Sequence, residues 1–271
     1  MVRYIYDGSF DGFLSVIYAC YYQKVPESIE RESSYNFSML FEDEIIETDM
    51  VRSNKVYKAI IEKISKDTLV YIYQAFLSEA RGMELKLFKY IQLGFMMGIK
   101  VSDFLTDGTV NEVQKYSRKV GFEAHRFLGL VRFQEFNSIL YAAIEPTYNI
   151  LELIGNHFKE RLQNEKWVIH DVKRKIGIVY ENNEWVLRDL KFEKLESHET
   201  EELFYQNLWK VFHKNVSIVE KKNESLQMSH MPKKYWSNLT EMKQQENKSN
   251  TISDTQEVEN KMKQIDNVIK Y

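Results

Sequence analysis

The chain has 271 residues and a formal net charge of −3, from 37 Lys and Arg against 40 Asp and Glu. Because 44% of its residues are apolar and 14% aromatic, it can bury a core, which excludes a collagen-like or wholly disordered chain. No apolar run approaches the roughly 20 residues of a bilayer-spanning helix, and the first residues show no secretory leader. We therefore expect a cytoplasmic protein with no membrane contact.

The sequence holds a single cysteine, Cys20, inside an apolar stretch. An internal disulfide is therefore impossible, which fits a reducing compartment. One thiolate also cannot build a Cys-based zinc site or an iron–sulfur cluster. A buried thiol is a simpler interpretation of Cys20 than a nucleophile. We expect neither a metal nor another resident cofactor.

The N-terminal half is predicted to be mainly helical. Residues 4–6 form a short strand, and an Asp-Gly-Ser turn then starts a helix. Residues 26–50 contain eight acids and one arginine, which indicates either a solvated excursion, the simpler reading, or an acidic partner surface. From residue 53 onward, apolar stripes at spacings of three and four predict successive helices, the last over about residues 110–127.

The apolar period changes to two in the middle of the chain. Residues 131–144 predict a hairpin that ends at Pro146, and a helix is expected over residues 150–162. Alternation then returns at residues 167–172, 176–180 and 185–187. Because short loops join consecutive strands in antiparallel fashion, we expect a small antiparallel sheet with an inserted helix, and an α+β fold class.

The C-terminal part is predicted to be helical again, over residues 200–215 and after Pro232. From residue 243 the composition turns polar, so residues 243–271 are expected to be a disordered tail. Four apolar residues of this tail have helical spacing and could dock on a partner: Val258, Met262, Ile265 and Ile269. Residues 1–242 are interpreted as a single α+β domain.

Charge is distributed unevenly along the chain. Residues 115–136, 156–176 and 205–236 carry net charges of +3, +3 and +4. Basic residues there alternate with aromatic ones, as in Arg132-Phe133 and Trp209-Lys210. Lys and Arg can hold a phosphate backbone while aromatic rings stack on unpaired bases. The alternative is that the cations lie on unrelated solvated faces and the aromatics belong to the core.

A polar set in the middle of the chain could carry chemistry. His157 and Arg161 are four residues apart and so share a helix face, whereas His170 and Asp171 point to opposite faces of a strand. His170 could act as a general acid or base, with Asp171 and Arg174 managing charge. For each histidine alone, a structural role is the simpler reading.

Several other site types are disfavoured by the sequence. His157, His170, His213 and His230 could in principle ligate a metal, but their spacing matches no known ligand pattern. The chain contains no P-loop, no Gly-x-Gly-x-x-Gly, no Gly-x-Ser-x-Gly and no zinc-deaminase signature.

Seven strings of residues between positions 2 and 242 are distinctive in combination: 4–13, 132–136, 142–146, 157–161, 167–174, 209–213 and 231–236. Together they resemble a bacterial family of DNA-metabolism or DNA-repair proteins. The core of that family is a domain of unknown function.

The resemblance implies a role beside a radical SAM protein of DNA-repair type, usually encoded next to it. That partner would supply the iron–sulfur cluster that Cys20 alone cannot hold. Some relatives carry a uracil-DNA glycosylase module, which we do not expect here because residues 243–271 form a short polar tail. Relatives often have Arg where this chain has Lys221 and Lys233, which lack the bidentate fork for phosphate.

Our leading hypothesis is a protein of DNA metabolism or repair that binds damaged or modified DNA and acts with the radical SAM partner. The proposed DNA contacts are Arg132, Arg161, Lys173, Arg174, Lys233, Lys234 and Trp236. The polar centre is His157, His170 and Asp171, with His213 and His230 as further candidates. Two alternatives remain: an enzyme acting on DNA or nucleotides through this His/Asp/Arg centre, and a protein-only adaptor that docks the partner through residues 26–50 or the tail.

Overall fold

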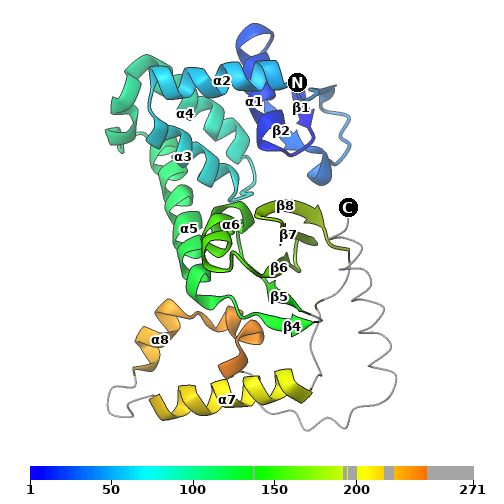
Figure 1. Cartoon of the computed structure of the whole chain (residues 1–271). Helices are drawn as coiled ribbons and strands as arrows, with labels where there is room; N and C mark the ends of the chain where they lie inside the picture. Colours follow the sequence, from blue (N-terminus) through cyan, green and yellow to red (C-terminus); the bar gives the residue numbers. More distant parts are fainter. Residues whose placement is uncertain (137, 192–193, 195–199, 217–222, 243–271) are drawn as a thin grey trace. The chain divides into compact units, whose positions relative to one another are not determined.

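The computed structural model describes residues 1–136, 138–191, 194, 200–216 and 223–242 (Figure 1). The chain forms two compact units that divide within the long helix α5 (Gly108–Leu130), after Phe122. Each unit combines a sheet with helices, which confirms the α+β class. The single domain over residues 1–242 stays a prediction. The predicted tail, residues 243–271, lies outside the described residues.

The N-terminal unit contains a three-stranded sheet in the order β2–β1–β3. The central strand β1 (Val2–Tyr6) is wholly buried, and both β2 (Ser28–Arg31) and β3 (Glu42–Ile45) run parallel to it. The sequence predicted only the first of these strands. The acidic segment 26–50 is therefore not a simple excursion, because it supplies both edge strands.

Arg3 explains why acidic residues belong in these strands. Its buried guanidinium donates to both carboxylate oxygens of Asp43 on β3, at 2.7 and 2.9 Å. It also lies 3.4 Å from a carboxylate oxygen of Glu30 on β2. Buried cations need such partners, so two of the eight acids stabilise the sheet rather than face a partner.

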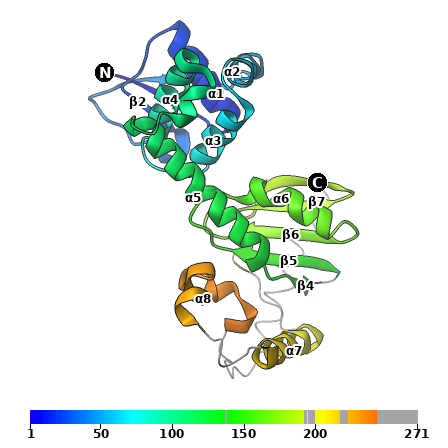
Figure 2. The same cartoon turned by 90° about the vertical axis from the view of Figure 1, so that its left-hand side faces the viewer.

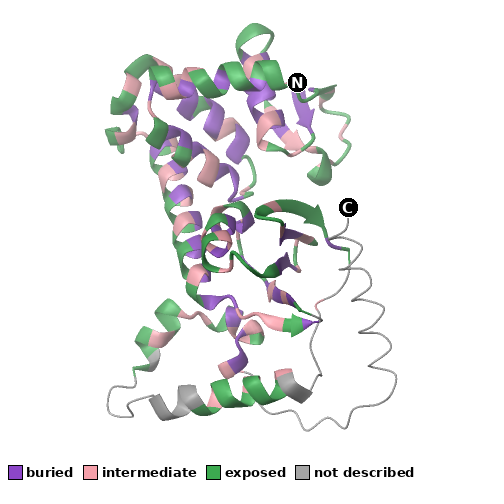
Figure 3. Cartoon of the chain, viewed as in Figure 1, coloured by how far each residue is buried: buried purple, intermediate pink, exposed green. Residues whose placement is uncertain are grey.

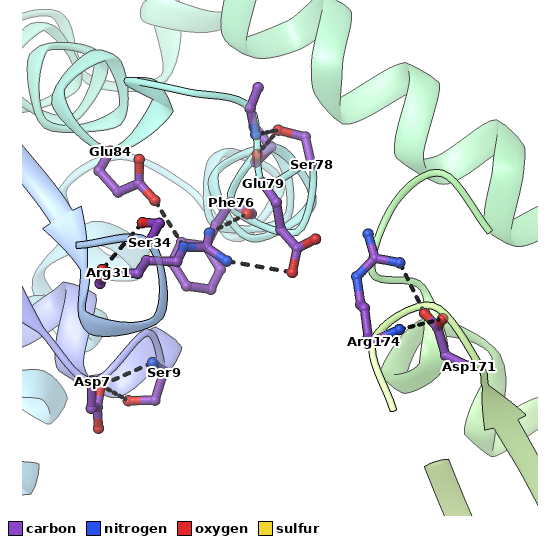
Figure 4. Close-up of polar contacts among 12 residues, drawn as sticks. Asp7, Ser9, Arg31, Ser34, Phe76, Ser78, Glu79, Glu84, Asp171 and Arg174 are labelled. Carbon is purple, nitrogen blue, oxygen red and sulfur yellow. Dashed lines mark hydrogen bonds and ion pairs between the residues drawn. The ribbon is translucent and has the colours of Figure 1, made fainter. Parts of the chain in front are cut away.

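Helices α1 (Phe10–Tyr22), α2 (Met50–Lys63), α3 (Lys66–Phe76) and α4 (Met83–Met97) complete this unit, with short turns of 3-10 helix at Glu32–Ser34 and Gly98–Asp103. Arg31, at the end of β2, donates to Glu84 on α4 at 3.0 Å and to the Phe76 carbonyl at 2.9 Å (Figure 4). Cys20 is buried within α1, and burial raises the pKa of its thiol to about 12. None of the described helices is long and apolar enough to cross a bilayer.

The second unit contains a five-stranded sheet in the order β4–β5–β6–β7–β8. Its strands are β4 (Gln134–Phe136), β5 (Ile139–Ile144), β6 (Lys166–Asp171), β7 (Ile176–Glu181) and β8 (Glu184–Asp189). Three of the four pairings are antiparallel as predicted, but β5 and β6 pair in parallel. The wholly antiparallel sheet was therefore wrong. Helix α6 (Leu151–Arg161) lies between these strands in sequence and acts as a crossover, which returns the chain in the same direction.

Buried residues occupy much of the strands β5, β6 and β7 (Figure 3), and apolar side chains pack on both faces of the sheet. Helix α6 and the C-terminal part of α5 lie on one face (Figure 2). There, the fully buried Trp167 stacks on Tyr180, with ring centroids 5.0 Å apart, and Phe158 of α6 meets Trp167 edge-on. The opposite face carries a second apolar cluster: Phe136, Ile139, Tyr141, Val168, Val179 and Leu190.

The C-terminal segment adds α7 (Thr200–Val216), α8 (Glu224–His230) and two 3-10 turns, η4 (Lys233–Asn238) and η5 (Thr240–Met242). The helix predicted after Pro232 is therefore a 3-10 helix. Glu123 of α5 fastens this segment. Its buried carboxylate accepts hydrogen bonds from the Tyr235 hydroxyl and from Lys234 Nζ at 3.3 Å.

The same carboxylate also fixes the loop after β5, accepting from the backbone N–H groups of Thr147 (3.0 Å) and Tyr148 (2.8 Å). Burial alone would raise the pKa of Glu123. The hydrogen bonds from Tyr235, Tyr148 and Thr147 outweigh burial and hold the pKa below its ordinary value. Glu123 is therefore ionised at neutral pH and joins three separate segments of the second unit.

Replacing Glu123 with glutamine should destabilise the second unit by about 3 kcal/mol at pH 7, because buried donors lose a charged acceptor. All four tryptophans lie beyond residue 122, so tryptophan fluorescence during urea unfolding reports on this unit. Since the folded pKa is depressed, the wild-type advantage should be full at neutral pH. It should shrink as the pH falls below the ordinary glutamate value of 4.5.

The control is Glu160→Gln, which alters an exposed carboxylate on α6. It should change the free energy of unfolding by less than about 0.5 kcal/mol. Equal stabilities of Glu123→Gln and Glu160→Gln at pH 7 would contradict the role assigned to Glu123.

Candidate nucleic-acid interface

The side chains that the sequence proposed for a site separate into distinct places in the second unit. His170 lies on β6 and is 0% exposed. Its Nδ1 is 2.8 Å from the Tyr141 hydroxyl on the neighbouring strand. Burial lowers the pKa of His170 to about 4, although a hydrogen bond with the Leu190 backbone opposes the shift. The imidazole is therefore neutral at physiological pH and enclosed by protein.

His157 does not approach His170. It lies on α6, where its ring packs edge-on against Phe158 with centroids 5.1 Å apart. Its Nε2 is buried and has no hydrogen-bond partner among the described residues. Within that part of the chain, no group of three or more His, Cys, Asp or Glu side chains is arranged to hold a metal ion.

Asp171 and Arg174 form a tight pair at the β6–β7 turn (Figure 4). Asp171 is 0% exposed and accepts from the Arg174 backbone N–H at 3.1 Å and from its Nη1 at 2.9 Å. Burial raises the pKa of Asp171, and the charge of Arg174 opposes this. Asp171 bonds to Arg174, whereas His170 bonds to Tyr141. This difference agrees with the prediction that these two strand neighbours point to opposite faces.

Arg174 and Lys234 converge on the loop after β5. Arg174 Nη2 donates to the Thr147 carbonyl at 2.9 Å, and Lys234 Nζ bonds the Thr147 hydroxyl and Glu123. Both cations therefore engage groups of their own chain. We interpret Glu123, Thr147, Asp171, Arg174 and Lys234 as a structural network rather than a phosphate site.

The remaining cations that the sequence proposed lie elsewhere. Lys173 is exposed at the turn between β6 and β7. Lys233 Nζ lies 5.7 Å from the Trp236 ring, and the Trp236 indole donates to the Met231 carbonyl at 2.9 Å. His230 ends α8. His213 belongs to α7, but its side chain lies outside the described part.

Arg132 and Arg161, in contrast, come together in a pocket of about 530 Å³. This volume is within the range of about 300–1,000 Å³ typical of small-ligand sites. The lining residues come from the end of α5, the segment before β4, the last turn of α6, α7 and η5: Leu128, Gly129, Val131, Arg132, Phe133, Phe158, Arg161, Leu162, Glu202, Tyr205, Gln206, Trp209 and Thr240.

An ion pair between Arg132 and Glu241 holds these elements together. Arg132 donates from Nε and Nη2 to the two carboxylate oxygens of Glu241, at 3.2 and 2.8 Å. The Trp209 indole N–H donates to the same carboxylate at 3.1 Å. Burial alone would raise the pKa of Glu241, but the bonds from Arg132 and Trp209 outweigh it and lower the pKa. Arg132 therefore joins the elements around the pocket, and the two guanidinium nitrogens that could bind a phosphate are already bonded to Glu241.

Arg161 has the opposite character. It is exposed at the end of α6, and no described side chain or carbonyl forms an ion pair or hydrogen bond with its guanidinium. Glu202, the acid in the pocket lining, is engaged by Gln206 Nε2 at 2.9 Å and by the Glu135 backbone N–H at 3.3 Å. An anion entering the pocket would therefore find its available positive charge at Arg161.

Sequence reasoning missed Glu202, Tyr205 and Gln206 as pocket residues, and Glu241 as the partner of Arg132. It noted Phe133, Phe158 and Trp209 only as aromatics beside basic residues. That alternation was a usable signal, because all three of these aromatics line the pocket. Nothing in the sequence indicated that Glu241 pairs with Arg132, since 109 positions separate them.

Residues 81–241 match the family described as a domain of unknown function, DUF4130. The chain belongs to this family. Every residue that lines the pocket lies inside the DUF4130 match, as does Glu241. No curated protein matches the chain. The DUF4130 domain includes α5 from end to end, so the family match crosses the division between the two compact units.

The burial of His170 can be measured directly by NMR. Because its pKa is lowered to about 4, the imidazole resonances should stay unchanged from pH 8 to pH 5 and begin to move only below that. A His170→Asn variant identifies the resonances. A titration midpoint between pH 6 and 7 would show that the ring is open to solvent and would restore it as an acid–base candidate.

Proposed function

We propose that this protein binds DNA through the pocket that Arg132 and Arg161 line. The observation that carries the proposal is the unpaired guanidinium of Arg161 beside aromatic rings, within the described residues of one pocket. Guanidinium groups bind phosphate oxygens in a bidentate manner, and aromatic rings stack on exposed bases. The basic excess of residues 115–136 and 156–176 supports the attraction of a polyanion to this unit.

The proposed context is DNA metabolism or repair in the cytoplasm, on damaged or modified DNA, together with a radical SAM partner. This context rests on the resemblance described above. The chemistry of the chain is compatible with it, because Cys20 is buried and could not hold an iron–sulfur cluster by itself. The reactive chemistry would then belong to the partner, and this chain would contribute DNA binding.

A catalytic role for His157, His170 and Asp171 is less well supported. A general acid or base must come within hydrogen-bond distance of its substrate. His170 and Asp171 are each 0% exposed, and His157 is not part of the pocket lining. An enzyme acting through these residues stays a prediction, ranked below DNA binding.

The adaptor alternative, expected to dock through residues 26–50 or the tail, stays a prediction, and α7 offers a further candidate surface. Phe204, Leu208 and Val211 are 62%, 53% and 55% exposed, and their spacing places them along one face of α7. Tyr205 and Trp209 occupy the face toward the pocket, so α7 has a second apolar face directed to solvent. Exposed apolar residues in a row are typical of protein-docking helices. We propose this face as the contact with the radical SAM partner.

Replacing Arg161 with glutamine should weaken DNA binding about tenfold at 0.1 M salt, because one charge-assisted phosphate contact is lost. The slope of log affinity against log salt should also become shallower by about 0.7–0.9, the change expected for one phosphate. Fluorescence anisotropy with labelled oligonucleotides from low to moderate salt measures both quantities.

The matched control is Lys159→Gln, which removes one positive charge from the same helix outside the pocket lining. It should leave the affinity within about twofold of wild type. If no oligonucleotide binds, or if affinity is independent of salt, the proposal of DNA binding fails.

Charged residues on the outer face of α7 should disrupt the partner contact. Phe204→Glu together with Leu208→Glu should abolish co-purification with the radical SAM protein encoded beside this chain, since two carboxylates would have to be desolvated. The isolated variant should still bind DNA, about two- to fivefold more weakly, because the added carboxylates lie on the helix that lines the pocket and repel phosphate. Undiminished co-purification would exclude this face as the docking surface.

A further inference from the structure

We propose that the pocket between α6 and α7 takes one unstacked nucleotide of single-stranded DNA, with the base on Tyr205 and Trp209 and a phosphate on Arg161. This inference rests on the proposed DNA binding and adds the form of DNA that the site selects. It is carried by the arrangement of rings and charge within the described pocket residues.

Tyr205 and Trp209 form the aromatic wall. They are four residues apart on α7, so both rings project from the same face of the helix, and both line the pocket. Despite their size they remain 57% and 40% exposed. Large aromatic rings usually bury most of their surface, so two adjacent rings that are each partly exposed offer a stacking platform for a flat ligand.

The Trp209 ring is fixed before any ligand arrives. Its indole N–H is bound to Glu241, and the Arg132 guanidinium lies 5.7 Å from its ring centroid. A ring that is already immobilised loses little conformational entropy when a base stacks on it. The ion pair between Arg132 and Glu241 therefore holds the Trp209 ring in place for stacking. The guanidinium of Arg132 is itself bonded to Glu241 and is not available for phosphate.

The part of the pocket wall that α6 supplies is apolar at Phe158 and positively charged at Arg161. Phe158 is 4% exposed and packs edge-on against Phe133, with ring centroids 5.5 Å apart. Arg161 follows one turn later. A ligand that is flat and apolar on its faces and anionic at one end matches this sequence of surfaces, and a nucleotide has that character.

Single-stranded DNA is favoured over duplex because of what the rings require. In a duplex each base is stacked on both faces by its neighbours, so neither face is accessible to Tyr205 or Trp209. A pocket of about 530 Å³ has the size of a small-ligand site, not of a groove for a double helix. Stacking and one phosphate contact are also tolerant of sequence, so we expect little preference among bases.

Glu202, the acid in the pocket lining, allows a second test in which single-strand affinity should rise instead of fall. Glu202 brings negative charge to the same pocket as Arg161, and a phosphate there meets some repulsion. Replacing Glu202 with glutamine removes the charge and keeps one acceptor oxygen, so the bond from either Gln206 Nε2 or the Glu135 N–H is retained. The substitution should therefore strengthen single-strand binding about two- to threefold, whereas Arg161→Gln weakens it.

The test compares a single-stranded oligonucleotide with its duplex, each carrying one 2-aminopurine, by anisotropy and by 2-aminopurine fluorescence. We expect at least tenfold tighter binding of the single strand and quenching of 2-aminopurine on binding. Tyr205→Leu should weaken single-strand binding about tenfold and reduce the quenching, and Tyr205→Phe should restore both. Tyr57→Leu, at an exposed tyrosine of the first unit, is the control and should change neither.

The outcomes separate this inference from the proposal of DNA binding. Equal affinity for single strand and duplex, or unchanged quenching in a folded Tyr205→Leu variant, would overturn the nucleotide pocket while leaving salt-dependent DNA binding in place. Failure of wild-type protein to bind either form would overturn both. Thermal melting followed by tryptophan fluorescence confirms that each variant is folded.

Discussion

The pocket depends on the ion pair between Arg132 and Glu241. It joins the segment that follows α5 to a 3-10 turn more than a hundred residues later, and the same carboxylate fixes the indole of α7. The side chain of Glu241 is 2% exposed and that of Arg132 is 22% exposed, so removing Arg132 would leave a carboxylate that is largely cut off from water. Breaking such a pair costs about 3–5 kcal/mol, which is a large share of the stability of a domain. The pocket and the anchoring of the C-terminal segment therefore share one electrostatic constraint.

The two arginines of the pocket differ in how their charge is paired. Arg132 is paired with Glu241 beside the aromatic wall, whereas the guanidinium of Arg161 has no ion-pair or hydrogen-bond partner among the described residues, and for that reason we propose it as the phosphate contact. The cations at Arg174 and Lys234 follow the first pattern, because each is satisfied by its own chain. A protein of near-neutral net charge can thus offer a local site for an anion without a large basic surface. Only the cations that form no ion pair within the chain remain available to bind it.

Much of the fold followed from local patterns, and the failures have identifiable causes. The helical stripes and the period-two strands of the second unit were readable because each buries one face. The parallel pairing of β5 and β6 could have been predicted as well, because the inserted helix α6 is itself a crossover. The edge strands β2 and β3 could not, since each has only four residues and carries acids that pair with the buried Arg3, far away in sequence.

The site was only partly predictable for the same reason. Arg161 and Phe158 share a turn of α6 and could be placed together from spacing alone. The meeting of α6 with α7 depends on contacts across the whole unit, and no local pattern reports them. The histidines illustrate the converse, because His170 has the residue type of a catalyst but the environment of a core residue. The sequence shows that His170 is a residue type able to transfer protons, but only the structure shows that its side chain is buried away from solvent.

Photo-crosslinking followed by peptide mass spectrometry tests the central claim most directly. A single-stranded oligonucleotide carrying 5-iodouracil crosslinks to the aromatic side chain on which the base stacks. We expect the crosslink in the α7 peptide at Tyr205 or Trp209, and its loss on competition with unlabelled single strand. A specific crosslink confined to peptides outside the pocket, or no crosslink under conditions where DNA is bound, would contradict the account.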